Sequence, residues 1–368
     1  MKKRILAFMM AAAMVFGSST AVMAAGEGQS SAADTMTVTI KKNYQVNGAD
    51  GAKSPAETFR FADATLAFVA GTKYNNTKYN NTGAVDTEKA VENSMNIPAD
   101  VRTIDITEPS YNEGENGEKD ITAVITAANY KSVGVGTYIY TFQETAGDTA
   151  GVTYDNNQYK LYVNVVNGDT AGTYKIGGAY VKKPGEIPKV QHIVNTYQSG
   201  NLKITKTVTG NMRDKNKVFD VNVTLTVADG KKVKAPVTIT TTDTDLGNPT
   251  TIAAGAWSGN KAVTLHVKDG TTVELKNLPV GVSYAVAEEA YSDYKTSYTQ
   301  NGNDITGAPA STAVRGNAID TVTITNRKDT AIDTGVIVSN LPYILILAAV
   351  AGGLVLFAAG KKHRADED

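Results

Sequence analysis

The sequence contains no cysteine, and only one tryptophan and three histidines occur among its 368 residues. Without cysteine the chain cannot form disulfides, thiolate metal sites or a thiol nucleophile. Its stability must therefore come from its hydrophobic cores or from another kind of cross-link. The formal net charge of −1 gives no reason to expect nucleic-acid binding.

Motifs for metal, cofactor or phosphate chemistry are also missing. His192, His266 and His363 stand far apart in the sequence, and no catalytic nucleophile or phosphate-binding loop accompanies them. We therefore expect no metal, no cofactor and no enzyme that turns over a substrate.

The N-terminus has the three parts of an export signal. Lys2, Lys3 and Arg4 precede an apolar run over 5–16, and small residues follow, ending in Ala24 and Ala25. This order is typical of a signal peptide. We predict one over 1–25, cleaved after Ala24 or Ala25. The basic start and the Gly/Ser-rich continuation do not favour the alternative, a buried N-terminal helix.

The C-terminus carries a second apolar segment. Residues 341–359 are nearly all apolar, interrupted only by Pro342 and by Gly352-Gly353, and a basic cluster follows over 361–364. Such a run is long enough to cross a bilayer. Basic residues directly after a span stay on the cytoplasmic side. The sequence therefore places the body of the chain outside the membrane.

The body has the pattern of short β-strands. Apolar and polar residues alternate over 36–40, 159–165 and 219–225, with many β-branched and aromatic side chains. Gly, Asn and Asp clusters separate such runs. The only helix signal is a short one over 87–93. Many short strands separated by polar turns favour an all-β fold, either a sandwich or a barrel. Of these we predict two tandem Ig-like β-sandwich domains.

The length of the body, roughly 300 residues, fits two domains. We place them at 35–199 and 200–328, joined by a short polar link near 198–200. The last segment, 329–368, contains the apolar run and the basic cluster described above.

The two domains carry the same signals in the same order. Each opens with a strand that ends in lysine, later has a strand that runs into glutamate, and closes with a strand that reaches asparagine. The residues at these three positions are Lys42, Glu144 and Asn195 in the first domain, and Lys206, Glu288 and Asn326 in the second. Because alternate residues of a strand share a face, all six continue an apolar, inward-facing row.

Burying such polar groups is costly unless they have partners. A spontaneous amide bond between lysine and asparagine supplies a reason for the burial. Burial favours neutral lysine, the nucleophilic form, and protonated glutamate, which can act as a general acid and base. A single lysine of this kind is usually a solvated edge residue, and a single asparagine usually belongs to a turn. The repetition of the triplet favours the cross-link, with Lys41 as the alternative to Lys42.

Three stretches carry a resemblance to a known family: 276–289, with the sequence KNLPVGVSYAVAEE; 152–155, with Tyr159 after it; and 324–329. The chain resembles the two-domain backbone pilins of streptococcal sortase-assembled pili, built from isopeptide-linkage domains of the collagen-adhesin B type. The resemblance covers residues 35–360. It implies the same six bond-forming residues and a role as the shaft subunit of a covalent surface pilus.

The resemblance also implies a sorting signal at Ala331-Ile332-Asp333-Thr334-Gly335, an LPXTG-like motif in which Asp333 stands where related pilins often carry proline. A membrane sortase would cleave between Thr334 and Gly335 and release the chain from its transient membrane span. The acceptor would be Lys189 of the next subunit, with Lys182 and Lys183 as alternatives.

The implied partners are sortase, identical subunits, minor pilins and cell-wall peptidoglycan. The implied location is the cell wall-anchored surface of a Gram-positive bacterium. Two alternatives remain: a wall-anchored adhesin that never polymerises, and a tail that serves as a permanent membrane anchor.

Overall fold

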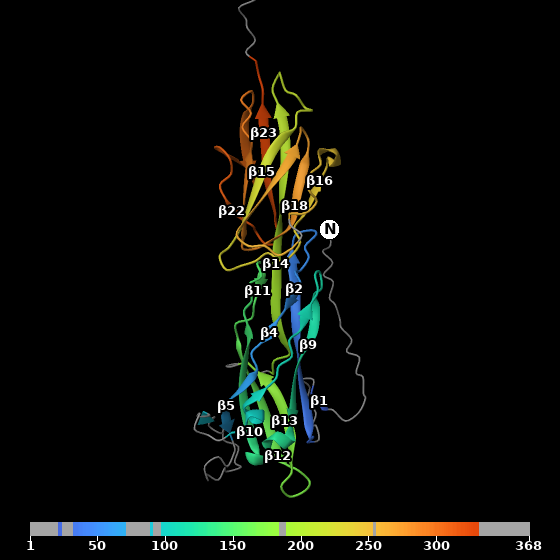
Figure 1. The fold of residues 1–368 in the computed structure, drawn as a ribbon, viewed down its shortest axis with the longest axis vertical. Helices are drawn as coiled ribbons and strands as arrows, with labels where there is room; N and C mark the ends of the chain where they lie inside the picture. The colour runs from blue at the N-terminus through green and yellow to red at the C-terminus, as the bar shows by residue number, and fades with distance from the viewer. Residues whose placement is uncertain are drawn as a thin grey trace, which may run out of the picture.

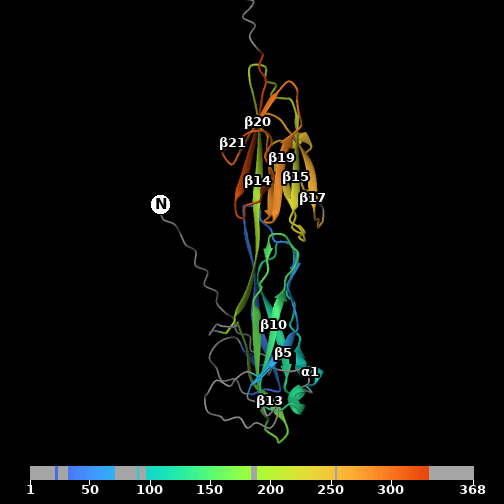
Figure 2. The same ribbon diagram turned by 90° about the vertical axis from the view of Figure 1, so that its left-hand side faces the viewer.

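The computed structural model describes residues 21–23, 32–70, 89–90, 97–183, 189–252 and 255–330. These residues form an elongated molecule in which two β-sandwiches stand end to end (Figure 1; Figure 2). Each sandwich has its own hydrophobic core, one mainly from residues 36–197 and the other mainly from residues 202–324. The predicted all-β class is confirmed.

The N-terminal sandwich places a sheet of long strands against a second sheet. The first sheet contains β2 (Thr35–Gly48), β9 (Gly117–Thr126) and the first part of β14 (His192–Thr209). The second has the order β13 (Tyr174–Lys182), β12 (Gln158–Asn167), β10 (Gly136–Thr145), β5 (Ala64–Ala70) and β6 (Lys89–Ala90). Short elements complete this half: β1 (Ala21–Met23), β3 (Glu57–Thr58), β4 (Arg60–Phe61), α1 (Ala99–Arg102), β7 (Thr103–Ile104), β8 (Ser110–Tyr111), the 3₁₀ helix η1 (Ala127–Ser132) and β11 (Val152–Thr153).

The C-terminal sandwich repeats this plan. One sheet contains the second part of β14 with β16 (Thr238–Thr241), β18 (Thr272–Pro279), β20 (Lys295–Gln300), β21 (Asn303–Ile305) and β23 (Ile319–Arg327). The facing sheet has the order β17 (Asn260–Val267), β15 (Phe219–Val227), β19 (Val282–Glu288) and β22 (Thr312–Ala313). The 3₁₀ helix η2 (Thr244–Leu246) lies after β16.

Alternation decides which side chains enter the cores. In β15 every second residue from Phe219 to Val227 is buried. In β2 the buried row is Met36, Val38, Ile40, Lys42 and Tyr44, so a lysine occupies a core position between two apolar neighbours. The period of two that the sequence shows is therefore the period of burial.

The predicted polar link near 198–200 is wrong. β14 continues without a break through this region, pairing in parallel with β2 over 192–199 and with β23 over 201–209. Ser199 is completely buried, and a Cβ on Gly200 would lie only 2.2 Å from the carbonyl oxygen of Arg315. Small polar residues occur here because other backbone packs against the strand, and not because the chain is a linker.

The predicted helix over 87–93 is also wrong where the structure describes it, because Lys89 and Ala90 form β6 and pair with β5. No helix in the described ranges is long and apolar enough to cross a membrane. The predicted tail span over 341–359 lies outside the described residues, as do Thr334 and Gly335.

Candidate cross-linking sites

In each sandwich the predicted lysine and asparagine lie on neighbouring parallel strands, and the asparagine is two residues beyond the residue opposite the lysine. Lys42 of β2 lies opposite Ile193 of β14, and Asn195 lies opposite Tyr44. In the second sandwich Lys206 of β14 lies opposite Ile324 of β23, and Asn326 lies opposite Val208. Both pairs of strands are parallel, so the two sites share the same offset of two residues on the inward face.

The N-terminal site is a closed triangle of buried side chains. Lys42, Glu144 and Asn195 are 0%, 2% and 1% exposed. The Nζ of Lys42 donates to the Oδ1 of Asn195 at 2.6 Å and also bonds the Oε2 of Glu144. The Nδ2 of Asn195 donates to the Oε1 of the same carboxyl group. The nucleophile, the electrophile and a proton carrier are therefore in mutual contact.

The C-terminal site has the same members with one difference. The Nζ of Lys206 bonds the Oε2 of Glu288, and the Nδ2 of Asn326 donates to the Oε1 of Glu288 at 2.5 Å. Unlike its counterpart, the Oδ1 of Asn326 is buried and accepts no hydrogen bond from the residues that the structure describes. The amide carbonyl of this site is thus open to an approaching donor.

A phenylalanine ring covers the amine at both sites. The Nζ of Lys42 lies 4.4 Å from the centroid of the Phe59 ring, and the Nζ of Lys206 lies 4.2 Å from that of Phe219. Both lysine side chains are 0% exposed, and the rings lie against their amines. Neither phenylalanine is predicted as a site residue from the sequence, although the position of Phe219 at the start of an alternating strand is a usable signal.

Burial shifts the proton equilibria of these groups. Desolvation lowers the pKa of Lys42, and the charge and hydrogen bond of Glu144 only partly oppose it. Desolvation likewise lowers the pKa of Lys206 from 10.5 to about 8, against the hydrogen bond and charge of Glu288. Burial raises the pKa of Glu144, against the stabilising charge of Lys42. Each shift favours the neutral form, as expected for a desolvated group.

Lys41, the alternative to Lys42, lies outside the site. Its side chain points away from the core, is 45% exposed and pairs with Asp120 at the surface. The one-residue difference in position along β2 places the two lysines on opposite faces of the sheet.

The predicted acceptor lysines cluster beside the start of β14. Lys189 is exposed, and its backbone forms an isolated antiparallel β-bridge with Lys182 of β13. The Nζ atoms of Lys189 and Lys182 lie 5.3 and 5.5 Å from the centroid of the same ring, that of Tyr180. Lys183 is half-buried. Of the three, Lys189 is the exposed one.

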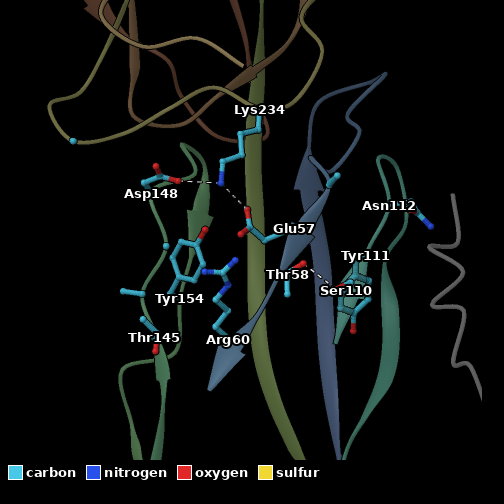
Figure 3. A pocket seen from close by; sticks show the side chains of 14 residues that line it. Glu57, Thr58, Arg60, Ser110, Tyr111, Asn112, Thr145, Asp148, Tyr154 and Lys234 are labelled. Atoms are coloured by element: carbon cyan, nitrogen blue, oxygen red, sulfur yellow. Dashed lines mark hydrogen bonds and ion pairs between the residues drawn. The ribbon is translucent and has the colours of Figure 1, made fainter. Parts of the chain in front are cut away.

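A surface pocket lies elsewhere, between the two sandwiches (Figure 3). There Lys234 reaches from the C-terminal sandwich to Asp148 at 3.0 Å and to Glu57 at 3.7 Å. Thr149 donates to the carboxylate of Glu57 from a fully buried position. None of the six predicted bond-forming residues lines this pocket, and its ion pairs serve to join the two halves.

The sequence is similar to those of known pilus proteins. The chain is 29% identical over 274 residues to a pilin of Streptococcus pyogenes serotype M1, covering 70% of this chain and 77% of the relative. The resemblance to streptococcal pilins is confirmed. A shorter stretch of 136 residues is 34% identical to the pilus tip adhesin Cpa of Streptococcus pyogenes, of which it covers 18%.

Residues 200–328 match a family profile described as a domain of unknown function (DUF7601). Among solved structures, the major pilin of Streptococcus pyogenes matches with 23% identity and a TM-score of 0.47, covering 80% of this chain and 99% of that one. The major pilin T3.2 of the same species matches with 20% identity and a TM-score of 0.49, covering 81% and 100%.

Proposed function

We propose that this chain is the structural shaft subunit of a covalent surface pilus, stiffened by two self-formed lysine–asparagine isopeptide bonds. The observation that carries the proposal is the pair of buried triads arranged around one strand. Asn195 and Lys206 both belong to β14, so the two bonds would tie the strands β2, β14 and β23 into one cross-linked unit. The similarity to streptococcal pilins supports the same role.

The geometry of the N-terminal site supports a direct condensation. The neutral amine of Lys42 attacks the side-chain carbonyl carbon of Asn195, forming the new C–N bond. Glu144 contacts both nitrogen atoms, so it can accept the proton that the amine loses and deliver a proton to the departing amide nitrogen. The C–N bond of the asparagine breaks and ammonia leaves. The same steps apply to Lys206, Glu288 and Asn326.

The reaction would occur once at each site and leave no free catalyst. The chain is therefore not an enzyme in the sense of turnover. The dry setting made by Phe59 and Phe219 supports the reaction, since a desolvated amine keeps its lone pair available.

Export and assembly follow from the ends of the chain. In our proposal the signal peptide over 1–25 directs secretion, and sortase cleaves between Thr334 and Gly335. The Thr334 carbonyl is then transferred to Lys189 of the next subunit, and the last subunit is joined to wall peptidoglycan. The exposure of Lys189 supports its choice over Lys183.

A second candidate is a wall-anchored adhesin that does not polymerise. The local similarity to a pilus tip adhesin favours keeping it as the alternative. Both candidates share the signal peptide, the sandwiches and the sorting signal, so only polymerisation separates them.

The deciding experiment is electrophoresis of wall extracts from a Gram-positive host that expresses the full chain with a pilus sortase. A ladder of heat- and detergent-resistant multimers is expected for the wild type. The ladder should disappear with Lys189→Ala and persist with the neighbouring controls Lys182→Ala and Lys183→Ala. Monomer alone in the wild type would favour the adhesin.

A further inference from the structure

One edge of β2 is covered by a segment that maturation would remove. On one side β2 pairs with β9 over 35–44. On the other side β14 pairs only from Lys41 onward. Before Lys41, the place of β14 beside β2 is taken by β1, which pairs in parallel with residues 36–38. Because β1 lies within the predicted signal peptide, cleavage after Ala24 or Ala25 leaves this edge bare.

The backbone groups at this edge can be assigned. The N–H of Lys41 donates to the carbonyl of Gln191, so Lys41 directs its backbone groups to the β14 side. These groups alternate along a strand, and Thr39 and Thr37 therefore direct theirs to the same side. Without β1, the N–H and C=O groups of Thr37 have no partner strand among the residues that the structure describes. A bare edge of this kind is a template for strand addition.

We propose that residues 331–334 of a second copy of this chain fill the edge, pairing as a short strand parallel to β2. The proposal rests on the proposed pilus function, because the incoming segment is the one that sortase joins to Lys189. It adds a non-covalent docking site for the sorting segment, which the covalent transfer alone does not require.

The position of Lys189 sets where that segment ends. His192 lies opposite Lys41 at the start of β14, and Lys189, three residues before it, forms an antiparallel backbone bridge with Lys182 of β13. Lys189 therefore lies within three residues of the point where the pairing of β2 with β14 begins. An incoming Thr334 bound to Lys189 therefore reaches the level of the bare edge. Its chain arrives from the outer end of the molecule, so it runs in the direction of β2, as β1 does.

The tether is short enough to require close docking. In the subunit that supplies the segment, Thr330 is held by Asn211, with hydrogen bonds of 3.0 Å to its N–H and 3.2 Å to its carbonyl. Only four residues then lead to Thr334. In extended form they span about 13 Å, so the end of one subunit must stand directly against the next.

The side chains of the segment fit the two faces of the sheet. With Thr334 opposite Val38, Ile332 lies opposite Met36 and Asp333 opposite Thr37. Paired residues of parallel strands point to the same face. Ile332 would then join the buried row of Met36 and Val38, and Asp333 would face solvent beside the half-buried Thr37.

Hydrogen exchange tests the pairing without changing the edge. Purified wild-type polymer is compared with the secreted Lys189→Ala monomer, both lacking residues 1–25. We expect the amides of Thr37 and Thr39 to exchange about tenfold or more slowly in the polymer. The amides of Met36, Val38 and Ile40 face β9 and serve as internal controls. Equal exchange in both samples overturns the proposal: fast exchange shows an empty edge, and slow exchange shows that the chain's own N-terminus fills it.

A pair of substitutions gives an independent test. Thr37→Pro removes the N–H that faces the edge, while Thr37→Val keeps it. We expect Thr37→Pro to reduce the multimer ladder about tenfold and Thr37→Val to leave it unchanged. Loss of ammonia from the N-terminal site shows that each variant has folded; if Thr37→Pro fails this check, the exchange comparison decides. A normal Thr37→Pro ladder overturns the docking site, whereas a missing wild-type ladder overturns the pilus function itself.

Discussion

Asn195 and Lys206 lie on the same strand, β14, yet each side chain enters a different hydrophobic core. Odd-numbered residues face inward around Asn195, whereas even-numbered residues face inward around Lys206. The change occurs at an irregularity between Gly200 and Leu202, where four consecutive residues are buried. A bulge of this kind re-aims the side chains that follow. It lets one strand close one sandwich and open the next.

The first prediction concerns the mass of the folded chain. The secreted body should be lighter than its sequence by two ammonia molecules, because each triad loses one. Glu144→Gln and Glu288→Gln keep the size of the side chain and remove the proton carrier, so each should restore one ammonia. Intact-mass spectrometry, followed by peptide mapping of the linked strands, measures this. An unchanged wild-type mass would refute both bonds.

The second prediction concerns stability. Lys42 and Asn195 are 153 positions apart, and a bond between them closes a loop whose entropy in the unfolded chain is worth about 5 kcal/mol by analogy with a disulfide. Glu144→Gln should therefore lower the melting temperature of the N-terminal sandwich by about 10–20 °C. Calorimetry can follow this transition. The C-terminal transition serves as the control and should not move.

The third prediction concerns pH. The mechanism needs one proton on the pair of Lys206 and Glu288, shared between an amine and a carboxyl group. The pKa of Lys206 is lowered to about 8 by burial, so this last proton leaves as the pH rises past that value. Bond formation at this site should thus be fastest below about pH 8 and fall roughly tenfold per pH unit above it.

The measurement is the rate of ammonia loss after a denatured, unlinked chain is diluted into buffers of different pH. Glu288→Gln is the control and should show no bond at any pH. A rate that rises through pH 8 to a plateau would show that only the free amine matters, and would remove the proton-delivering role of Glu288.

The fourth prediction concerns the junction between the sandwiches. Asn277 is buried, has a positive φ of 64°, and its side chain donates to the carbonyls of Lys53 and Pro236 at 2.9 and 3.0 Å. Asn277→Gly relieves the backbone but loses these bonds, so we expect a cost of about 1–3 kcal/mol and a more flexible junction. Denaturant unfolding and small-angle scattering report the two effects.

Asn317 is a matched control for this substitution. It also has a positive φ, 53°, but its side chain is exposed. Asn317→Gly should change the free energy of unfolding by less than about 0.5 kcal/mol. Equal effects of the two substitutions would show that the junction does not depend on the Asn277 side chain.

The sequence predicts which lysine, glutamate and asparagine side chains meet in each core, because strand alternation is a local property. Lys42 and Lys206 continue apolar rows, and the structure places both against the expected glutamate. Phe59 could not be predicted in this way because it lies between β3 and β4. Each of these strands has only two residues, which is too short to show an alternating pattern. Gly200 was misjudged for a related reason: its tight contact is with Arg315, more than a hundred residues away, and no local pattern reports it.

If both proposed bonds form, the continuity of β14 gives them different mechanical roles. In the proposed polymer, tension enters a subunit at Lys189 and leaves at Thr334. Between these points it runs along β14 to Lys206, crosses the bond to Asn326, and continues to the sorting motif, so the C-terminal sandwich is bypassed. Apart from the first part of β14, the strands of the N-terminal sandwich precede Lys189 in the chain and lie outside this path of tension. The bond at Lys206 would therefore limit the stretch of the fibre, while the bond at Lys42 would protect its sandwich against heat and proteases.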